Sequence, residues 1–218
     1  GSAPRAAEGA ACAAAAAVGA LDRALSASGM PRDDAAWRAL LAVAASEARA
    51  ALEFLVVMAP PAAGEPAPEA AGTDPLRALA TTLLLVVVTP ARVAALQIGD
   101  GAVVIEDGLG QTSALTAPDY GEYLNETVFL TSPDYLERAQ VAIAAPPALR
   151  GVALFTDGIQ MLALNLADGT PHGPFFAPLF SFAAGGSATD ADLAAFLQSD
   201  RVNARTDDDK TLLLAVRA

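Results

Sequence analysis

The sequence holds one cysteine, Cys12, and one histidine, His172, among its 218 residues. A single cysteine excludes a disulfide within the chain and suits a reducing compartment, so we expect a cytoplasmic protein. Cys12 stands in an alanine-rich stretch, where a small buried apolar residue is expected rather than a nucleophile. His172 stands in a turn-rich segment without a second histidine or cysteine nearby. The sequence therefore lacks the several ligands that a zinc site needs and the adjacent residue pair that Cys-His catalysis needs.

Basic residues and long apolar runs are also scarce. The 13 basic residues are scattered and face 25 acidic ones, which gives a net charge of −12. This charge repels a phosphate backbone and favours bound cations, so we expect no nucleic-acid partner. No run of 18 apolar residues occurs, so no membrane span or membrane partner is expected. The GxSxG elbow of serine hydrolases and the phosphate-binding P-loop are absent as well.

Alanine, valine and leucine must build the core, because 54% of the residues are hydrophobic and only 6% are aromatic. The length suits a single domain over residues 1–218. Residues 6–28 are mostly alanine and predict a helix. In residues 33–58, apolar side chains recur at spacings of three and four, which predicts a second helix with one apolar stripe. The short connection between them indicates an antiparallel pair, and residues 59–75, rich in Pro and Ala, predict a loop.

The hydrophobic period changes after the loop. Short apolar segments joined by Asp-Gly turns are typical of an antiparallel meander, here over 81–89, 92–98, 102–106 and 111–115. The first segment is wholly apolar and is expected at the centre of its sheet. Residues 116–150 are irregular in composition and predict a protruding, flap-like lobe with little core. Further helices are expected over 158–166, 175–182 and 190–198, and buried strands over 152–155 and 211–217. This order of elements indicates a layered α+β domain.

Four Asp-Gly pairs begin at residues 100, 107, 157 and 168. Asp-Gly is a common turn sequence, and we interpret Asp107 and Asp168 as turn formers only. Asp157 differs because it ends an apolar strand, so its carboxylate should emerge at the edge of a core. Another such strand follows Asp207-Asp208-Asp209, a run that a solvated loop would equally tolerate.

Carboxylates at the ends of adjacent buried strands can converge on one point. Hard cations such as Mg²⁺ and Mn²⁺ prefer oxygen ligands of this kind and usually keep several waters. Asp100, in a tight Gly-Asp-Gly turn at another strand end, could join Asp157 and Asp208. Such ions can activate a water for attack on phosphorus.

Four segments, taken in order and spacing, resemble the metal-dependent protein phosphatase family, type 2C, in its bacterial branch. They are LATTLLLVVV (79–88), LQIGDGAVV (96–104), LFTDGIQ (154–160) and DDDKTLLLAV (207–216). The stretch GEYLNETVFLTSP (121–133) is similar to the flap region of that branch. The resemblance covers nearly the whole chain.

The resemblance implies a four-layer α-β-β-α sandwich with two antiparallel sheets. It implies hydrolysis of phosphoserine and phosphothreonine in a phosphorylated protein substrate, with a metal-activated water as nucleophile and no catalytic side chain. The implied cofactors are Mn²⁺ or Mg²⁺, as two ions and a third weak one. A serine/threonine kinase is an expected further partner, as in signalling.

Three aspartates match the family's metal-binding positions residue by residue. Asp157 matches the Asp of its Ser/Thr-Asp-Gly motif, and Asp208 matches the Asp of its Asp-Asn-x-Thr motif, with Asp209 where Asn is usual. Asp100 matches the Asp of its Gly-Asp-Ser or Gly-Asp-Gly turn, which is linked to the third metal. Met161 stands where some members carry a further Asp.

The beginning of the chain resembles the end of the family's Asp-Gly-x-Gly motif. The strands, acidic ligands and phosphate-binding Arg that precede this point are then expected to be missing, and the site to be incomplete or inactive. The alternative is a non-catalytic phosphatase-like module that binds a kinase or a phosphoprotein. A third possibility is a structural domain whose aspartates only form turns.

Overall fold

The computed structural model describes residues 3–58, 74–118, 127–165 and 167–217. The expected loop over 59–75 lies almost wholly outside these residues, as does part of the expected flap-like lobe. The chain divides into two compact units. The first comprises Gly1–Leu85, Leu96–Gly99 and Asn125–Val141, and the second comprises Val86–Ala95, Asp100–Leu124 and Ala142–Ala218.

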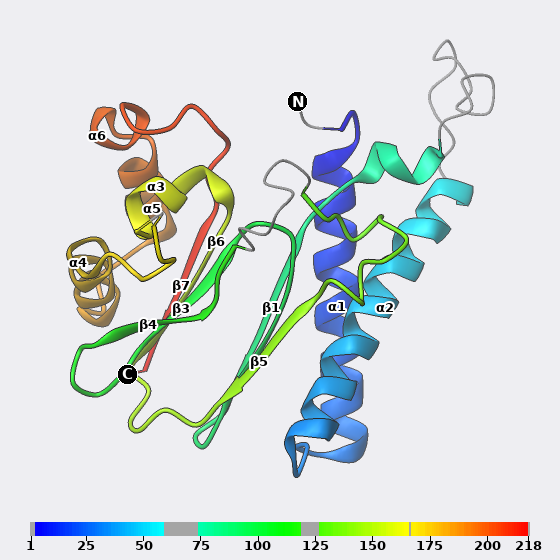
Figure 1. Ribbon diagram of the computed structural model, residues 1–218, viewed down its shortest axis with the longest axis horizontal. Coiled ribbons are helices and arrows are strands. Elements are labelled where there is room, and N and C mark those ends of the chain that lie inside the picture. Colours follow the sequence, from blue (N-terminus) through cyan, green and yellow to red (C-terminus); the bar gives the residue numbers. More distant parts are fainter. Residues whose placement is uncertain (1–2, 59–73, 119–126, 166, 218) are drawn as a thin grey trace. The chain divides into compact units, whose positions relative to one another are not determined.

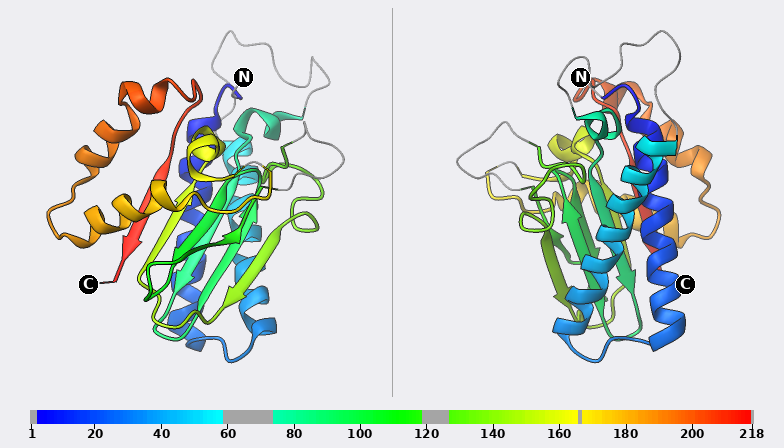
Figure 2. Two further views of the ribbon diagram at one scale, coloured as in Figure 1. Left: turned by 60° about the vertical axis from the view of Figure 1, so that its left-hand side comes forward. Right: turned by 90° about the vertical axis from the view of Figure 1, so that its right-hand side faces the viewer.

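Two long helices lie side by side in the first unit (Figures 1 and 2). They are α1 (Ala6–Ser28) and α2 (Asp34–Met58), and they confirm the helix pair expected from the sequence. Small side chains on α1 and larger ones on α2 are buried, which lets the two axes approach closely. Cys12 is half-buried rather than buried, because it lies beside the buried stripe of α1. The buried residues of the pair include Ala13, Ala17, Ala20, Leu21, Trp37, Leu41, Ala44, Ala48 and Leu52.

Helix α1 is long and apolar enough to cross a membrane, and among the described residues it is the one helix of which this holds. Length and composition alone are weak evidence, because a core helix or a signal sequence passes the same test. The expectation of no membrane span stays a prediction.

Arg49 connects α2 to a later segment of the same unit. Its Nη1 donates to the carbonyl oxygens of Leu130, at 2.9 Å, and of Ser132, at 2.8 Å. Its Nε pairs with Glu53 at 2.8 Å, and its guanidinium lies 5.4 Å from the ring centroid of Tyr135. A planar group with several donors suits these contacts better than an ammonium would.

The first sheet has three strands in the order β1-β2-β5. They are β1 (Leu83–Val88), β2 (Val93–Ile98) and β5 (Gln140–Ala144). The expectation that the first strand is central was wrong, since β2 lies between the other two and all six of its residues are buried. Strand β5 was missed altogether, because it lies inside the segment expected to be an irregular lobe.

The second sheet has four strands in the order β4-β3-β6-β7. They are β3 (Ala102–Glu106), β4 (Thr112–Thr116), β6 (Gly151–Phe155) and β7 (Leu212–Val216), all antiparallel to their neighbours. The expected four-strand meander is therefore divided, since β2 and β3 belong to different sheets. Strand β7 alternates between buried and exposed residues instead of being buried throughout, and it is the last of the described strands at its end of this sheet.

Helices of the second unit follow β6. A 3-10 turn (Asp157–Ile159) leads into α3 (Gln160–Ala163), so the helix expected over 158–166 is shorter and is followed by a bridge between Leu164 and Pro171. The other helices are α4 (Gly173–Ala184), α5 (Asp190–Leu197) and α6 (Asp200–Asn203). Thr189 and Asp192 form a complete capping box at the start of α5. Two antiparallel sheets with these helices confirm the α+β class.

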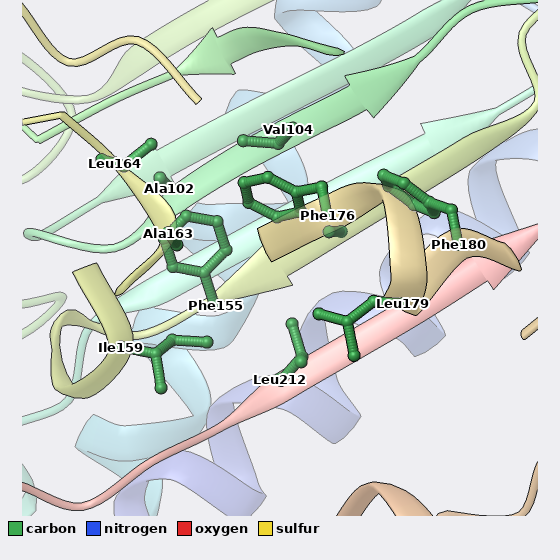
Figure 3. Packing of buried hydrophobic residues seen from close by; sticks show 11 residues of the cluster. Ala102, Val104, Phe155, Ile159, Ala163, Leu164, Phe176, Leu179, Phe180 and Leu212 are labelled. Atoms are coloured by element: carbon green, nitrogen blue, oxygen red, sulfur yellow. The ribbon is translucent and has the colours of Figure 1, made fainter. Parts of the chain in front are cut away.

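Aromatic side chains from α4 pack against the second sheet (Figure 3). The ring of Phe176 lies 5.8 Å from that of Phe155 in β6 and 6.1 Å from that of Phe180. Phe155 and Ile159 are each 1% exposed, on either side of the turn that carries Asp157. Burial of such side chains contributes about 1.5–3 kcal/mol each. This core therefore fixes the backbone on both sides of Asp157.

Candidate metal site at one edge of the second sheet

Three strand ends meet at the same edge of the four-stranded sheet. Ala102, the first residue of β3, pairs with Phe155, the last residue of β6, and Phe155 pairs with Leu212, the first residue of β7. Asp100 lies two positions before Ala102, and Asp157 lies two positions after Phe155. Antiparallel pairing thus brings strand ends 53 and 57 residues apart in the sequence to one edge.

The ends of β6 and β7 are joined by hydrogen bonds at Thr156. Its backbone N–H donates to the Thr211 carbonyl oxygen at 3.2 Å, and its Oγ1 accepts from the Thr211 N–H at 3.1 Å. Asp208, three residues before Thr211, is held locally: its N–H donates to Thr206 Oγ1, and its carbonyl accepts from Lys210 Nζ. The turn that carries Asp157 is thereby fixed next to the segment that carries Asp208.

Gly158 allows the closest approach in this region. A Cβ at this position would collide with the carbonyl oxygen of Asp209 and would meet Lys210 Cγ at 3.3 Å. The Asp157 turn and the acidic run therefore pack backbone against backbone, which only glycine permits. Sequence analysis interpreted Gly158 as part of a turn and missed this contact, since nothing in the local pattern reveals it.

Asp100 is tied to the same region by Gln160. Gln160 begins α3, and its side-chain amide donates a hydrogen bond to the backbone carbonyl oxygen of Asp100. Both residues are half-buried. This contact was not foreseen, because the two residues are far apart in the sequence and glutamine at the start of a helix carries no such signal.

The carboxylates act on one another electrostatically. Partial burial raises the pKa of Asp157, and the negative charges of Asp100 and, to a smaller extent, Asp208 raise it further. Hydrogen bonds from the backbone N–H groups of Gly158 and of Asp157 itself oppose the shift and lower the pKa. Mutual repulsion of this kind is relieved when a cation binds between the groups.

These aspartates fit a hard divalent cation only in part. Carboxylate oxygens are the right donors for Mg²⁺ or Mn²⁺. Within the described ranges, however, no group of three or more Asp, Glu, His or Cys side chains is close enough to hold a metal ion. Asp157 and Asp208 are exposed residues, although neighbouring atoms partly desolvate the carboxylate of Asp157, so the described residues offer ligands to an open site rather than a closed one. Met161, 63% exposed, carries a thioether, which is a poor donor for these hard cations.

The remaining Asp-Gly aspartates are turn formers, as expected. Asp107 accepts hydrogen bonds from the N–H groups of Leu109 and Gln111, each at 2.9 Å. Asp168 accepts from the hydroxyl of Thr170 at 2.6 Å and from its N–H at 3.0 Å, which lowers the pKa of the Asp168 carboxyl. Asp107 directly follows β3, at the end of that strand away from Asp100.

Solved structures with the same fold include bacterial phosphatases. The chain superposes on a crystal structure of a bacterial serine phosphatase variant with a TM-score of 0.57 and 14% identity, covering 93% of this chain and 76% of that one. It superposes on the catalytic domain of the serine/threonine protein phosphatase PstP, solved with two manganese ions, with a TM-score of 0.53 and 17% identity. That match covers 94% of this chain and 80% of the PstP chain.

Sequence comparison points the same way. Serine/threonine-protein phosphatase 3 of Escherichia coli strain K12 is 43% identical over 148 residues, which are 66% of this chain. The match spans 58% of the length of the E. coli protein. The model of the protein phosphatase 2C family matches residues 1–198. The chain therefore belongs to the protein phosphatase 2C family.

Proposed function

We propose that the protein is a metal-dependent serine/threonine phosphoprotein phosphatase whose metal ligands include Asp157, Asp208 and Asp100. One observation supports the proposal: in a chain of this family, the ends of β3, β6 and β7 next to these aspartates are paired neighbours in one sheet. Phosphatases of the family use Mn²⁺ or Mg²⁺, and the related PstP structure contains two manganese ions.

The chain's own residues have defined tasks in this proposal. Asp157, fixed between buried Phe155 and Ile159, presents an oxygen donor with little freedom of the backbone. Asp208 presents a second oxygen donor from the segment that leads into β7. A bound divalent cation supplies Lewis acidity and activates water toward a phosphate monoester. Since the chain carries a net charge of −12, a cation at this edge is also needed to attract an anionic phosphate group.

The substrate proposed is a protein phosphorylated on serine or threonine, and a serine/threonine kinase is the partner that would produce it. The names of the E. coli relative and of PstP support this substrate class. A role in signalling and a cytoplasmic location complete the proposal, and the single cysteine supports the latter.

The direct test is Mn²⁺-dependent hydrolysis of a phosphothreonine peptide by the full-length protein. Asp157→Asn removes a proposed ligand while keeping the size of the side chain, so activity should fall at least about 100-fold. Asp168→Asn is the matched control, since it makes the same change in another Asp-Gly pair that only shapes a turn, and it should leave activity nearly unchanged.

Equal activity of Asp157→Asn and the wild type would contradict the proposal. If the wild type binds phosphoproteins without metal-dependent turnover, the alternative of a non-catalytic binding module replaces it.

A further inference from the structure

Gln160 makes a contact that the proposed chemistry does not use. It begins α3, directly after the 3-10 turn of Asp157, and its Nε2 donates to the carbonyl oxygen of Asp100. The side chain is half-buried, whereas its neighbour Met161 is 63% exposed. Gln160 therefore points toward the turn between β2 and β3 and not into solvent.

The Asp100 turn needs an anchor of this kind. Asp100 stands between Gly99, whose φ is +108°, and Gly101, so the backbone on both sides has more freedom than other residues allow. A hydrogen bond to the carbonyl of Asp100 fixes the peptide plane that follows its side chain. Because Asp157 lies in the 3-10 turn directly before α3, the side chain of Gln160 links the positions of the two aspartates.

The carboxylates of Asp100 and Asp157 repel each other, so the contact made by Gln160 has to hold the two turns together. Like charges at a short distance push apart the segments that carry them. The side-chain amide of Gln160 has no charge, and it donates to a backbone carbonyl oxygen rather than to a carboxylate. It can therefore hold the Asp100 turn against the Asp157 turn and leave both carboxylates charged and available to a cation.

We propose that Gln160 is a positioning residue that holds the Asp100 turn against the Asp157 turn, so that both carboxylates contribute to one divalent-cation site. The inference rests on the proposed function. Groups that orient metal ligands without touching the metal commonly change metal affinity about 10–100-fold when they are removed.

The test is calorimetric titration of Mn²⁺ into the metal-free full-length protein. Gln160→Leu removes the donor at similar size and should weaken Mn²⁺ binding about tenfold, while the metal-free variant stays folded with only a small loss in melting temperature. Gln198→Leu, the same change at an exposed position at the end of α5, is the control and should bind Mn²⁺ like the wild type. Unchanged binding by Gln160→Leu would overturn the inference.

A double-mutant cycle tests whether the effect passes through Asp100. In an Asp100→Ala background the carboxylate to be positioned is gone, so Gln160→Leu should weaken Mn²⁺ binding no further. An equal loss in both backgrounds would overturn the positioning role. Asp157→Asn separates the two proposals: if it abolishes Mn²⁺ binding while Gln160→Leu does not change it, only the role of Gln160 fails. If the wild type does not bind Mn²⁺, the proposed function and the role of Gln160 fail together.

Discussion

Asp157 and Asp168 occupy similar Asp-Gly sequences but have opposite electrostatic surroundings. The pKa of Asp157 is raised, by partial burial first and by Asp100 and Asp208 next. The pKa of Asp168 is lowered, mainly by the hydroxyl of Thr170. The sequence predicted which of the two ends a core strand, but it could not predict the shift of Asp157, because that shift depends on Asp100 and Asp208, which only the folded chain brings near it. The shift of Asp168 is local, since Thr170 is two residues away.

The opposite shifts predict opposite effects of removing the charge. A raised folded-state pKa favours the folded state below the ordinary value of 3.8, and this gain is lost as the pH rises through the folded-state pKa. The metal-free Asp157→Asn variant should therefore melt at a higher temperature than the wild type at pH 7. The difference should shrink toward zero as the pH is lowered through the raised pKa to about 4.

The control for this comparison is Asp168→Asn. A lowered pKa contributes stability above the ordinary value that is lost as the pH falls, so this variant should not gain stability at pH 7. Melting curves in chelator at several pH values measure both effects. A lower melting temperature for metal-free Asp157→Asn at pH 7 would show that its carboxylate is stabilised, not repelled, by its surroundings.

At the scale of elements, the sequence predicted most strands and helices because their patterns are local. Strand β3 has the expected bounds, and α1 and α5 agree within one residue. Pairing between strands was harder to predict: Gly99-Asp100-Gly101 resembles a hairpin turn, yet β2 and β3 enter different sheets. Strand β5 was missed because its few apolar residues lie among turn-forming ones, and only pairing with β2 identifies it as a strand.

The junction of β6 and β7 gives a prediction at the same scale. Gly158→Ala would place a methyl group against the carbonyl oxygen of Asp209, so the two strand ends must separate. We expect a loss of about 1–3 kcal/mol in the free energy of unfolding, measured by urea denaturation. Weaker Mn²⁺ binding should accompany it, since the separation moves Asp157 away from Asp208.

Gly173→Ala is the matched control for this change. A Cβ at Gly173, in the first turn of α4, meets nothing within 4 Å, so alanine should be neutral or slightly stabilising there. If both substitutions change the free energy of unfolding by the same amount, the close approach at Gly158 does not determine the stability of the junction between β6 and β7.

At the scale of the whole molecule, family membership and charge could be predicted from sequence, whereas the spacing of the carboxylates at the site could not. The aspartates were identified from motifs at strand ends, and the structure brings Asp100 and Asp157 to one edge. The described residues do not form a cluster that encloses a metal ion, and a motif at a strand end does not indicate how closely its side chain approaches the others. The negative charge of the chain has two consequences that experiments can separate. The net charge of −12 causes repulsion throughout the protein, and the aspartates at the edge of the second sheet bind a cation in the proposed function.

These two consequences predict different responses to salt and to Mn²⁺. With a net charge of −12, the metal-free protein should gain a few degrees in melting temperature between about 20 and 200 mM NaCl, because salt screens the repulsion. At matched ionic strength, Mn²⁺ should raise the melting temperature further, since a ligand that binds only the folded state stabilises it by mass action. Asp157→Asn should keep the response to NaCl and lose the additional response to Mn²⁺. If Mn²⁺ raises the melting temperature of the wild type no more than NaCl does at the same ionic strength, the cation only screens charge. The proposed metal site at the edge of β6 and β7 is then refuted.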